Sequence, residues 1–260
     1  MKFKEILHGT AASRDAEQGY SGLKYQIYEF LAAVLVKILM YTPITANQIT
    51  LLGIVFVYVA AILFGYGTLY LGILAVGFIY LGELMDATDG TLARSKKACS
   101  KLQSNILGNL YHSSAYSILF LGIGFGVFVG TGNCIFILLG GISAFFQQTM
   151  GLIRFLGSQV MFKNRELLKE KGKENLLDEA DEKKLFKVGK KSFKNFFIEL
   201  IGAPIKHLRL IIIVVLILNY TIYPMAFSIF TIFYAIFIPI KTLGFLHSIY
   251  YSFKRIETKN

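Results

Sequence analysis

Long apolar runs with few charged residues alternate with short clusters of charge along this chain, and the apolar runs predict membrane spans. The runs occupy about residues 47–65, 69–85, 105–130 and 133–160, followed by a pair within residues 208–250 that turns near residues 219–224. A helix needs about 20 mostly apolar residues to cross a bilayer. We therefore predict an all-α membrane protein with six transmembrane helices.

The N-terminal part of the chain has a different pattern. Residues 1–23 are polar and lack the uninterrupted apolar stretch of a cleavable signal peptide. From residue 24 to residue 41 apolar residues recur at helical spacing, while Glu29 and Lys37 interrupt the apolar run. This pattern predicts an amphipathic helix that lies in the membrane interface and ends before Pro43.

The distribution of charge predicts the orientation of the spans. Basic clusters lie in the N-terminal part, around Arg94, between the fourth and fifth spans, and in the tail, whereas the turns near residues 65–70, 130–133 and 219–224 carry no charge. Because basic loops stay in the cytoplasm, we expect a multi-pass cell-membrane protein with both termini inside. The expected parts are a cytoplasmic N-terminus with its interfacial helix (1–42), a transmembrane domain (43–252) that includes a charged cytoplasmic segment (161–207), and a cytoplasmic tail (253–260).

Composition agrees with this prediction and excludes several function classes. The 260 residues are 55% hydrophobic and only 17% charged, which is more apolar than a soluble core requires. The net charge of +11 then reflects topology and attraction to anionic lipid headgroups, so we expect no nucleic-acid partner. Cys99 and Cys134 fall on opposite sides of the membrane in this topology and cannot pair, and the four histidines have no zinc-ligand spacing.

The candidate chemistry lies at the end of the second span. Asp86 and Asp89 are three residues apart and share one face of a helix, which suits oxygen coordination of a hard divalent cation. Gly90 and Ala93 leave room for a ligand near the backbone, and Arg94 presents a planar fork of donors to phosphate. The segment therefore predicts a pocket for a metal-bound phosphoanhydride. The alternative is a helix end that carries an acidic pair and a cytoplasmic arginine.

The pattern Asp86-x-x-Asp89-Gly90-x-x-Ala93-Arg94 resembles the first half of the signature of the CDP-alcohol phosphotransferase family, also called CDP-alcohol phosphatidyltransferases. The resemblance implies an integral membrane enzyme that moves a phospho-alcohol group from a CDP-linked alcohol or lipid donor to a hydroxyl acceptor and releases CMP. Such transfers serve phospholipid or related polar-lipid synthesis.

Residues 43–53 resemble the start of the family's first span, so a second stretch agrees with the motif. The resemblance implies Mg²⁺ or Mn²⁺ as the cofactor, a homodimer, and an active site on the cytoplasmic side. It implies metal ligation by Asp86 and Asp89 and nucleotide binding by Asp86, Gly90, Ala93 and Arg94.

The second half of the family signature is altered in this chain. The family continues, eight residues after the arginine, with G-x-x-x-D-x-x-x-D. Counting on from Arg94, three residues without a carboxylate stand at those positions: Gln103, Leu107 and Tyr111. Glu83, one turn before Asp86, is a further candidate oxygen ligand for the metal, or else the partner of a basic side chain.

A polar face of the third span offers a different set of candidates. Asn105, Asn109 and His112 lie on one side of a helix with about 100° per residue. A one-residue insertion would align His112 with the family's last acid, where a neutral imidazole accepts a proton as the catalytic base. Asn105 and Asn109 are then candidate metal ligands. The alternative is that these side chains only hydrogen-bond one helix to another.

Two basic residues inside otherwise uncharged runs are candidates for binding the acceptor or a lipid. Arg154 lies on the fourth span, and Lys241 lies near the cytoplasmic end of the sixth. Snorkelling of these long side chains to the headgroups explains both positions equally well.

Two function hypotheses remain after these observations. The first is the metal-dependent transferase. The second is a non-catalytic homologue that keeps the nucleotide-binding half and acts as a nucleotide-binding or lipid-binding membrane subunit. A small transporter has little support, because no pair of interrupted spans occupies corresponding halves of the sequence.

Overall fold

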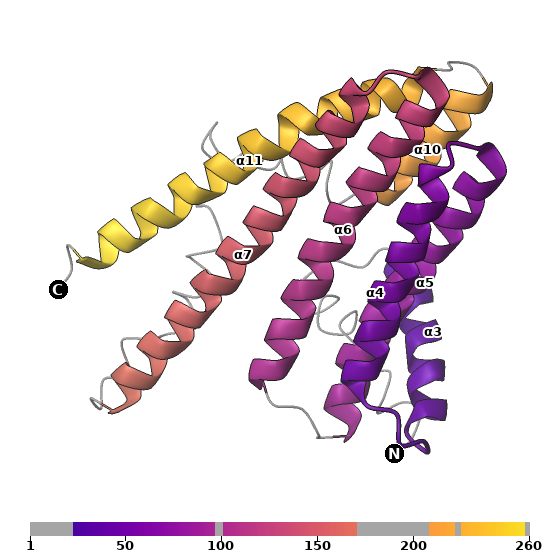
Figure 1. Ribbon diagram of the computed structural model, residues 1–260. Helices are drawn as coiled ribbons and strands as arrows, with labels where there is room; N and C mark the ends of the chain where they lie inside the picture. Colours follow the sequence, from indigo (N-terminus) through magenta and orange to yellow (C-terminus); the bar gives the residue numbers. More distant parts are fainter. Residues whose placement is uncertain (1–22, 97–100, 171–207, 222–224, 258–260) are drawn as a thin grey trace.

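The computed structural model describes residues 23–96, 101–170, 208–221 and 225–257, and all regular elements in these residues are α-helices (Figure 1). In chain order they are α3 (Leu23–Leu39), α4 (Ala46–Gly65), α5 (Leu69–Lys96), α6 (Lys101–Thr131), α7 (Ile135–Glu170), α10 (Leu208–Thr221) and α11 (Ala226–Glu257). The prediction of an all-α protein is confirmed for this part of the chain.

Within the described residues, five helices are long and apolar enough to cross a membrane: α4, α5, α6, α7 and α11. The protein is therefore a multi-pass membrane protein. The remaining predicted span coincides with α10, which has 14 described residues. At 1.5 Å per residue this is about 21 Å, which is less than the hydrocarbon core of about 30 Å. The count of six spans stays a prediction.

Two helices continue beyond the predicted ends of their spans. α5 runs without a break through the Asp86–Arg94 motif to Lys96, and α7 runs past residue 160 to Glu170. The bilayer limits the length of an apolar run, but charged residues such as Arg and Glu are good helix formers. The motif is therefore helical throughout, and the described start of the predicted charged segment 161–207 is a continuation of α7.

Tight turns join α4 to α5 and α6 to α7. Each contains a glycine with a positive φ, Gly67 at 66° and Gly132 at 72°, a conformation that side chains disfavour.

At the other end of α4, Thr45 and Gln48 form a capping box. We call this end of the bundle, where α4 begins and α5 ends in Arg94 and Lys96, the basic end.

Small residues bring the backbones of neighbouring spans into contact. A Cβ built on Gly122 of α6 would lie 2.2 Å from the carbonyl oxygen of Ala61 on α4. A Cβ built on Gly53 of α4 would lie 3.1 Å from the carbonyl oxygen of Gly82 on α5. Contacts of this kind are usual between membrane helices, where small residues permit close approach. They fix the registers of α4, α5 and α6 relative to one another.

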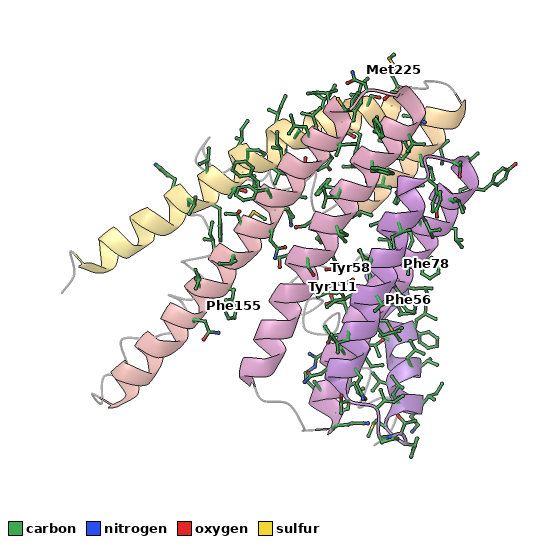
Figure 2. The ribbon with its side chains drawn as sticks, in the orientation of Figure 1. Phe56, Tyr58, Phe78, Tyr111, Phe155 and Met225 are labelled. Atoms are coloured by element: carbon green, nitrogen blue, oxygen red, sulfur yellow. The ribbon has the colours of Figure 1, made fainter. Side chains whose placement is uncertain are left out.

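A cluster of aromatic residues fills the bundle between α6 and α11. Phe120, Phe230 and Tyr234 are buried, and the rings of Phe230 and Tyr234 have their centroids 4.5 Å apart. Phe56 and Phe78, whose centroids are 5.9 Å apart, join α4 to α5 (Figure 2). Figure 1 shows α6 and α7 side by side, with α11 inclined to both.

Helix α3 lies along the part of α5 that carries the motif. Ala33 and Val36 of α3 are buried in one cluster with Ile49 of α4 and Leu92 of α5. On the other side of α3, large apolar side chains are exposed: Phe30, Leu31, Val34 and Ile38. A helix is present where the sequence predicts an amphipathic one, and its location in the membrane interface stays a prediction.

Candidate active site

The two aspartates of the motif continue the buried face of α5. Gly72, Ala75, Ile79 and Gly82 are buried and are spaced three or four residues apart. The same spacing reaches positions 86, 89 and 93, so Asp86, Asp89 and Ala93 lie on the side of α5 that faces the other spans. Both carboxylates are half-buried at the basic end.

Asp89 is anchored to the neighbouring helix. The hydroxyl group of Thr50, on α4, donates a hydrogen bond to Oδ2 of Asp89. The same hydroxyl lies 3.2 Å from the carbonyl oxygen of Ala46. Asp86 interacts electrostatically with Asp89 and with the hydroxyl group of Tyr116 on α6. The acidic pair therefore lies where α4, α5 and α6 meet.

Arg94 is folded back along α5 over the glycine of the motif. Its Nη2 donates a hydrogen bond of 3.1 Å to the hydroxyl oxygen of Thr91. Its guanidinium group lies beside Gly90, where a Cβ would be 3.3 Å from Nη1. The side chain is exposed, so an anion at the basic end can reach its guanidinium group.

Lys96 ties the end of α5 to the turn before α4. Its Nζ donates hydrogen bonds of 2.8 Å to the carbonyl oxygens of both Thr42 and Ile44. Thr88 and Leu92 are fully buried, and Leu92 packs with Ala33 and Val36 of α3. The motif helix is thus held along its side by α3 and at its end by Lys96.

The third-span candidates lie on α6, and their side chains lie outside the described residues. Positions 105, 109, 112 and 116 continue, at helical spacing, the line of Leu119 and Ile123, which are buried. Asn105, Asn109 and His112 therefore occupy positions on the inward side of α6. Their roles as metal ligands and base stay predictions.

Tyr111 occupies the position of the family's last acid in the ungapped count. It is 3% exposed, and its ring packs between Gly53 of α4 and Gly82 of α5 (Figure 2). Val57 and Ala115 complete this small cluster. In this chain the position therefore contributes to helix packing.

The other candidates, Glu83, Arg154 and Lys241, lie on α5, α7 and α11. The carboxylate oxygens of Glu83 are buried, one turn from Asp86 on α5. Lys241 is half-buried and follows Phe230, Tyr234 and Ile238 on the inward side of α11. Position 154 of α7 continues the line of Gly140, Gln147 and Gly151, and the side chain of Arg154 lies outside the described residues. Their roles stay predictions.

The donor set fits a cation that arrives with phosphate better than a metal held only by protein. In the part of the chain that the structure describes, no three His, Cys, Asp or Glu side chains lie close enough to hold a metal ion. Mg²⁺ usually keeps several waters and binds through one or two carboxylates together with substrate phosphates. Asp86 and Asp89 provide such a pair, with the orientation of Asp89 fixed by Thr50.

Sequence reasoning missed Thr50 and Lys96. Thr50 lies within the stretch that resembles the family's first span, but the spacing of that stretch gives no partner for its hydroxyl. In the sequence, Lys96 is only one of several basic residues near Arg94. Both bonds join residues about 40 to 55 positions apart, so only the packing of α4 on α5 reveals them.

Comparison with known protein families shows to which family the chain belongs. A family model described as CDP-alcohol phosphatidyltransferase matches residues 43–240, which include α4 to α7, α10 and about the first half of α11. The chain belongs to the CDP-alcohol phosphatidyltransferase family. Members of this family are membrane transferases that move a phospho-alcohol group from a CDP-alcohol to a hydroxyl acceptor, and they generally use divalent metals. No curated protein matches the chain.

Proposed function

We propose that this CDP-alcohol phosphatidyltransferase is a catalytically active, Mg²⁺- or Mn²⁺-dependent enzyme of phospholipid or related polar-lipid synthesis. The observation that carries the proposal is the position of Asp86 and Asp89 on the inward face of α5, with Asp89 bonded to Thr50 of α4. A membrane span that ends in an oriented acidic pair beside an arginine suits a pyrophosphate with its cation.

The reaction requires one bond to form and one to break. The oxygen of the acceptor hydroxyl attacks the phosphorus that carries the donor alcohol, the anhydride bond to CMP breaks, and the hydroxyl proton passes to a base. Asp86 and Asp89 would hold the cation, which when bound neutralises charge that develops on the leaving CMP. Gly90 and Ala93 provide room for the nucleotide end.

Other residues would complete the site. Arg94 binds phosphate with its exposed guanidinium group. His112 is the proposed proton acceptor. Oxygen atoms from Glu83, Asn105 and Asn109 supplement the coordination. Arg154 and Lys241 bind the acceptor or a lipid headgroup.

We propose a homodimer in the cell membrane, with the basic end and both termini in the cytoplasm, where CDP-linked donors are made.

A second candidate function rests on the packing of Tyr111. A buried tyrosine in the place of the family's last acid removes one carboxylate from the site, and Leu107 removes another. A protein with this site that retains only nucleotide or lipid binding would act as a non-catalytic membrane subunit.

Release of CMP separates these two functions. Purified protein in lipid nanodiscs would be incubated with CDP-diacylglycerol, its ether-linked analogue and soluble CDP-alcohols, each with Mg²⁺ or Mn²⁺ and a mixture of small hydroxyl acceptors. Metal-dependent release of CMP from at least one donor is the result expected of the enzyme. Binding of CDP without CMP release from any donor would establish the non-catalytic alternative.

A further inference from the structure

The hydroxyl group of Thr50 links α4 to the acidic pair by its hydrogen bond to Asp89. Its side chain is 4% exposed, and its hydroxyl proton faces both Asp89 and the carbonyl oxygen of Ala46. A hydroxyl has a single proton to donate. Because a hydrogen bond to a carboxylate is about twice as strong as one between neutral groups, the proton goes to Asp89.

The end of α4 that carries Thr50 is itself held in place. The capping box of Thr45 and Gln48 fixes its first turn, and Lys96 holds the preceding turn through the carbonyl oxygens of Thr42 and Ile44. Asp89 and Lys96 are seven residues apart, so α5 contacts the start of α4 twice along one face. The hydroxyl of Thr50 is thus a fixed point against which the Asp89 carboxylate is oriented.

The residue type suits this task. Threonine is branched at Cβ and has only two favoured χ1 rotamers on a helix, so its hydroxyl has few alternative directions. Gly53 and Val57, one and two turns further along α4, are buried against α5 and α6, which prevents rotation of the helix. A carboxylate oriented before the cation arrives loses less conformational freedom on binding.

We infer that Thr50 is a positioning residue that orients Asp89 for divalent-cation binding and thereby sets the metal affinity of the site. The inference rests on the proposed function, because it takes Asp89 to be a ligand of the cation. Partners that hydrogen-bond to metal ligands typically change metal affinity by about 10–100-fold when they are removed. Thr50 does not touch substrate, so its effect passes through Asp89.

The test measures metal affinity apart from turnover. Thermal stabilisation of the purified protein by CDP would be recorded over a series of Mn²⁺ concentrations, and Mn²⁺ binding would be followed by its electron paramagnetic resonance signal. Thr50→Val keeps the shape of the side chain and removes the hydroxyl. Thr50→Ala removes the hydroxyl without placing a methyl group against the carboxylate, and serves if the valine variant does not fold. Thr50→Ser restores a hydroxyl.

A matched control is available on α7. The hydroxyl oxygen of Thr149 lies 2.9 Å from the carbonyl oxygen of Phe145, four residues earlier, just as that of Thr50 lies 3.2 Å from the carbonyl oxygen of Ala46. Among the described residues, no carboxylate accepts a hydrogen bond from Thr149. Thr149→Val therefore removes the same backbone contact without affecting the acidic pair.

The expected result is a rise of about 10–100-fold in the Mn²⁺ concentration for half-maximal stabilisation in Thr50→Val and Thr50→Ala. Thr50→Ser and Thr149→Val should stay near the wild type. Wild-type Mn²⁺ dependence in both Thr50→Val and Thr50→Ala overturns the positioning role and leaves the proposed function intact. A wild-type protein that CDP does not stabilise in a metal-dependent way overturns the proposed function, and this inference with it.

Discussion

The guanidinium group of Arg94 lies against Gly90, one turn earlier on α5, so closely that a Cβ on Gly90 would be 3.3 Å from Nη1. Because Gly90 has no side chain, the guanidinium group of Arg94 can lie against the helix at this position, next to Asp89 in the sequence. This contact gives a physical reason for a glycine inside the motif helix, where glycine otherwise costs up to about 1 kcal/mol relative to alanine.

Gly90→Ala should disturb nucleotide binding by displacing Arg94. The added methyl group forces the flexible guanidinium group to move, and the loss of one charge-assisted hydrogen bond of about 1.5 kcal/mol to phosphate raises KM for the donor about tenfold. Gly77→Ala on the same helix is the control, since nothing lies within 4 Å of a Cβ built there. Equal KM values in the two variants would show that the Arg94 position does not matter for donor binding.

His112→Ala tests which residue replaces the family's missing base. A positioned general base typically contributes 10²–10⁴-fold, so CMP release should fall by roughly two to four orders of magnitude while CDP binding changes little. The measurement is CMP release under single-turnover conditions together with CDP titration. An active wild type with an unaffected His112→Ala variant would remove His112 from the mechanism.

The ungapped alternative predicts the opposite response at two neighbouring positions. Restoring the family acids by Leu107→Asp or Tyr111→Asp would increase CMP release if those positions faced the reacting phosphate. We expect loss of folded protein instead for Tyr111→Asp, because the tyrosine ring packs between Gly53 and Gly82. Leu107→Asp should also be damaging, because it places an acid against lipid or a packed helix. Higher activity in either variant would contradict the assignment of His112.

Cys134 tests the orientation of the bundle. It is exposed at the turn between α6 and α7, opposite the basic end, and the predicted topology places it outside the cell. A membrane-impermeant thiol reagent applied to intact cells should label the wild type and Cys99→Ser but leave Cys134→Ser unlabelled. Labelling that disappears only in Cys99→Ser would place the basic end, and with it the proposed active site, outside the cytoplasm.

The helices of this protein could be predicted because the membrane imposes a simple rule on the sequence. Uncharged runs of about 20 residues mark α4, α5, α6 and α7 to within a few residues of the observed helices at most of their ends. The apolar run marks the part of a helix that lies in the hydrocarbon core of the bilayer and does not mark the end of the helix. For this reason α5 and α7 extend further than predicted.

The acidic pair could be placed from the sequence, but its partners could not. Asp86 and Asp89 follow Ile79 and Gly82 at helical spacing, so the inward face of α5 can be deduced from one segment alone. The bond from Thr50 to Asp89 depends on how α4 is rotated against α5, and glycine contacts such as Gly53 with Gly82 determine that rotation. Tyr111 likewise reveals its packing role only when three helices are assembled.

The metal dependence of CDP binding tests the central claim most directly. Thermal stabilisation by CDP would be measured with and without Mg²⁺ in the wild type and in the Asp86→Asn Asp89→Asn double variant, whose neutral amides are no costlier to insert into the membrane. If Asp86 and Asp89 hold the cation, CDP at 100 times its Kd stabilises the wild type by about 2.7 kcal/mol only when Mg²⁺ is present, and does not stabilise the double variant. Mg²⁺-dependent stabilisation that survives in the double variant would contradict the account.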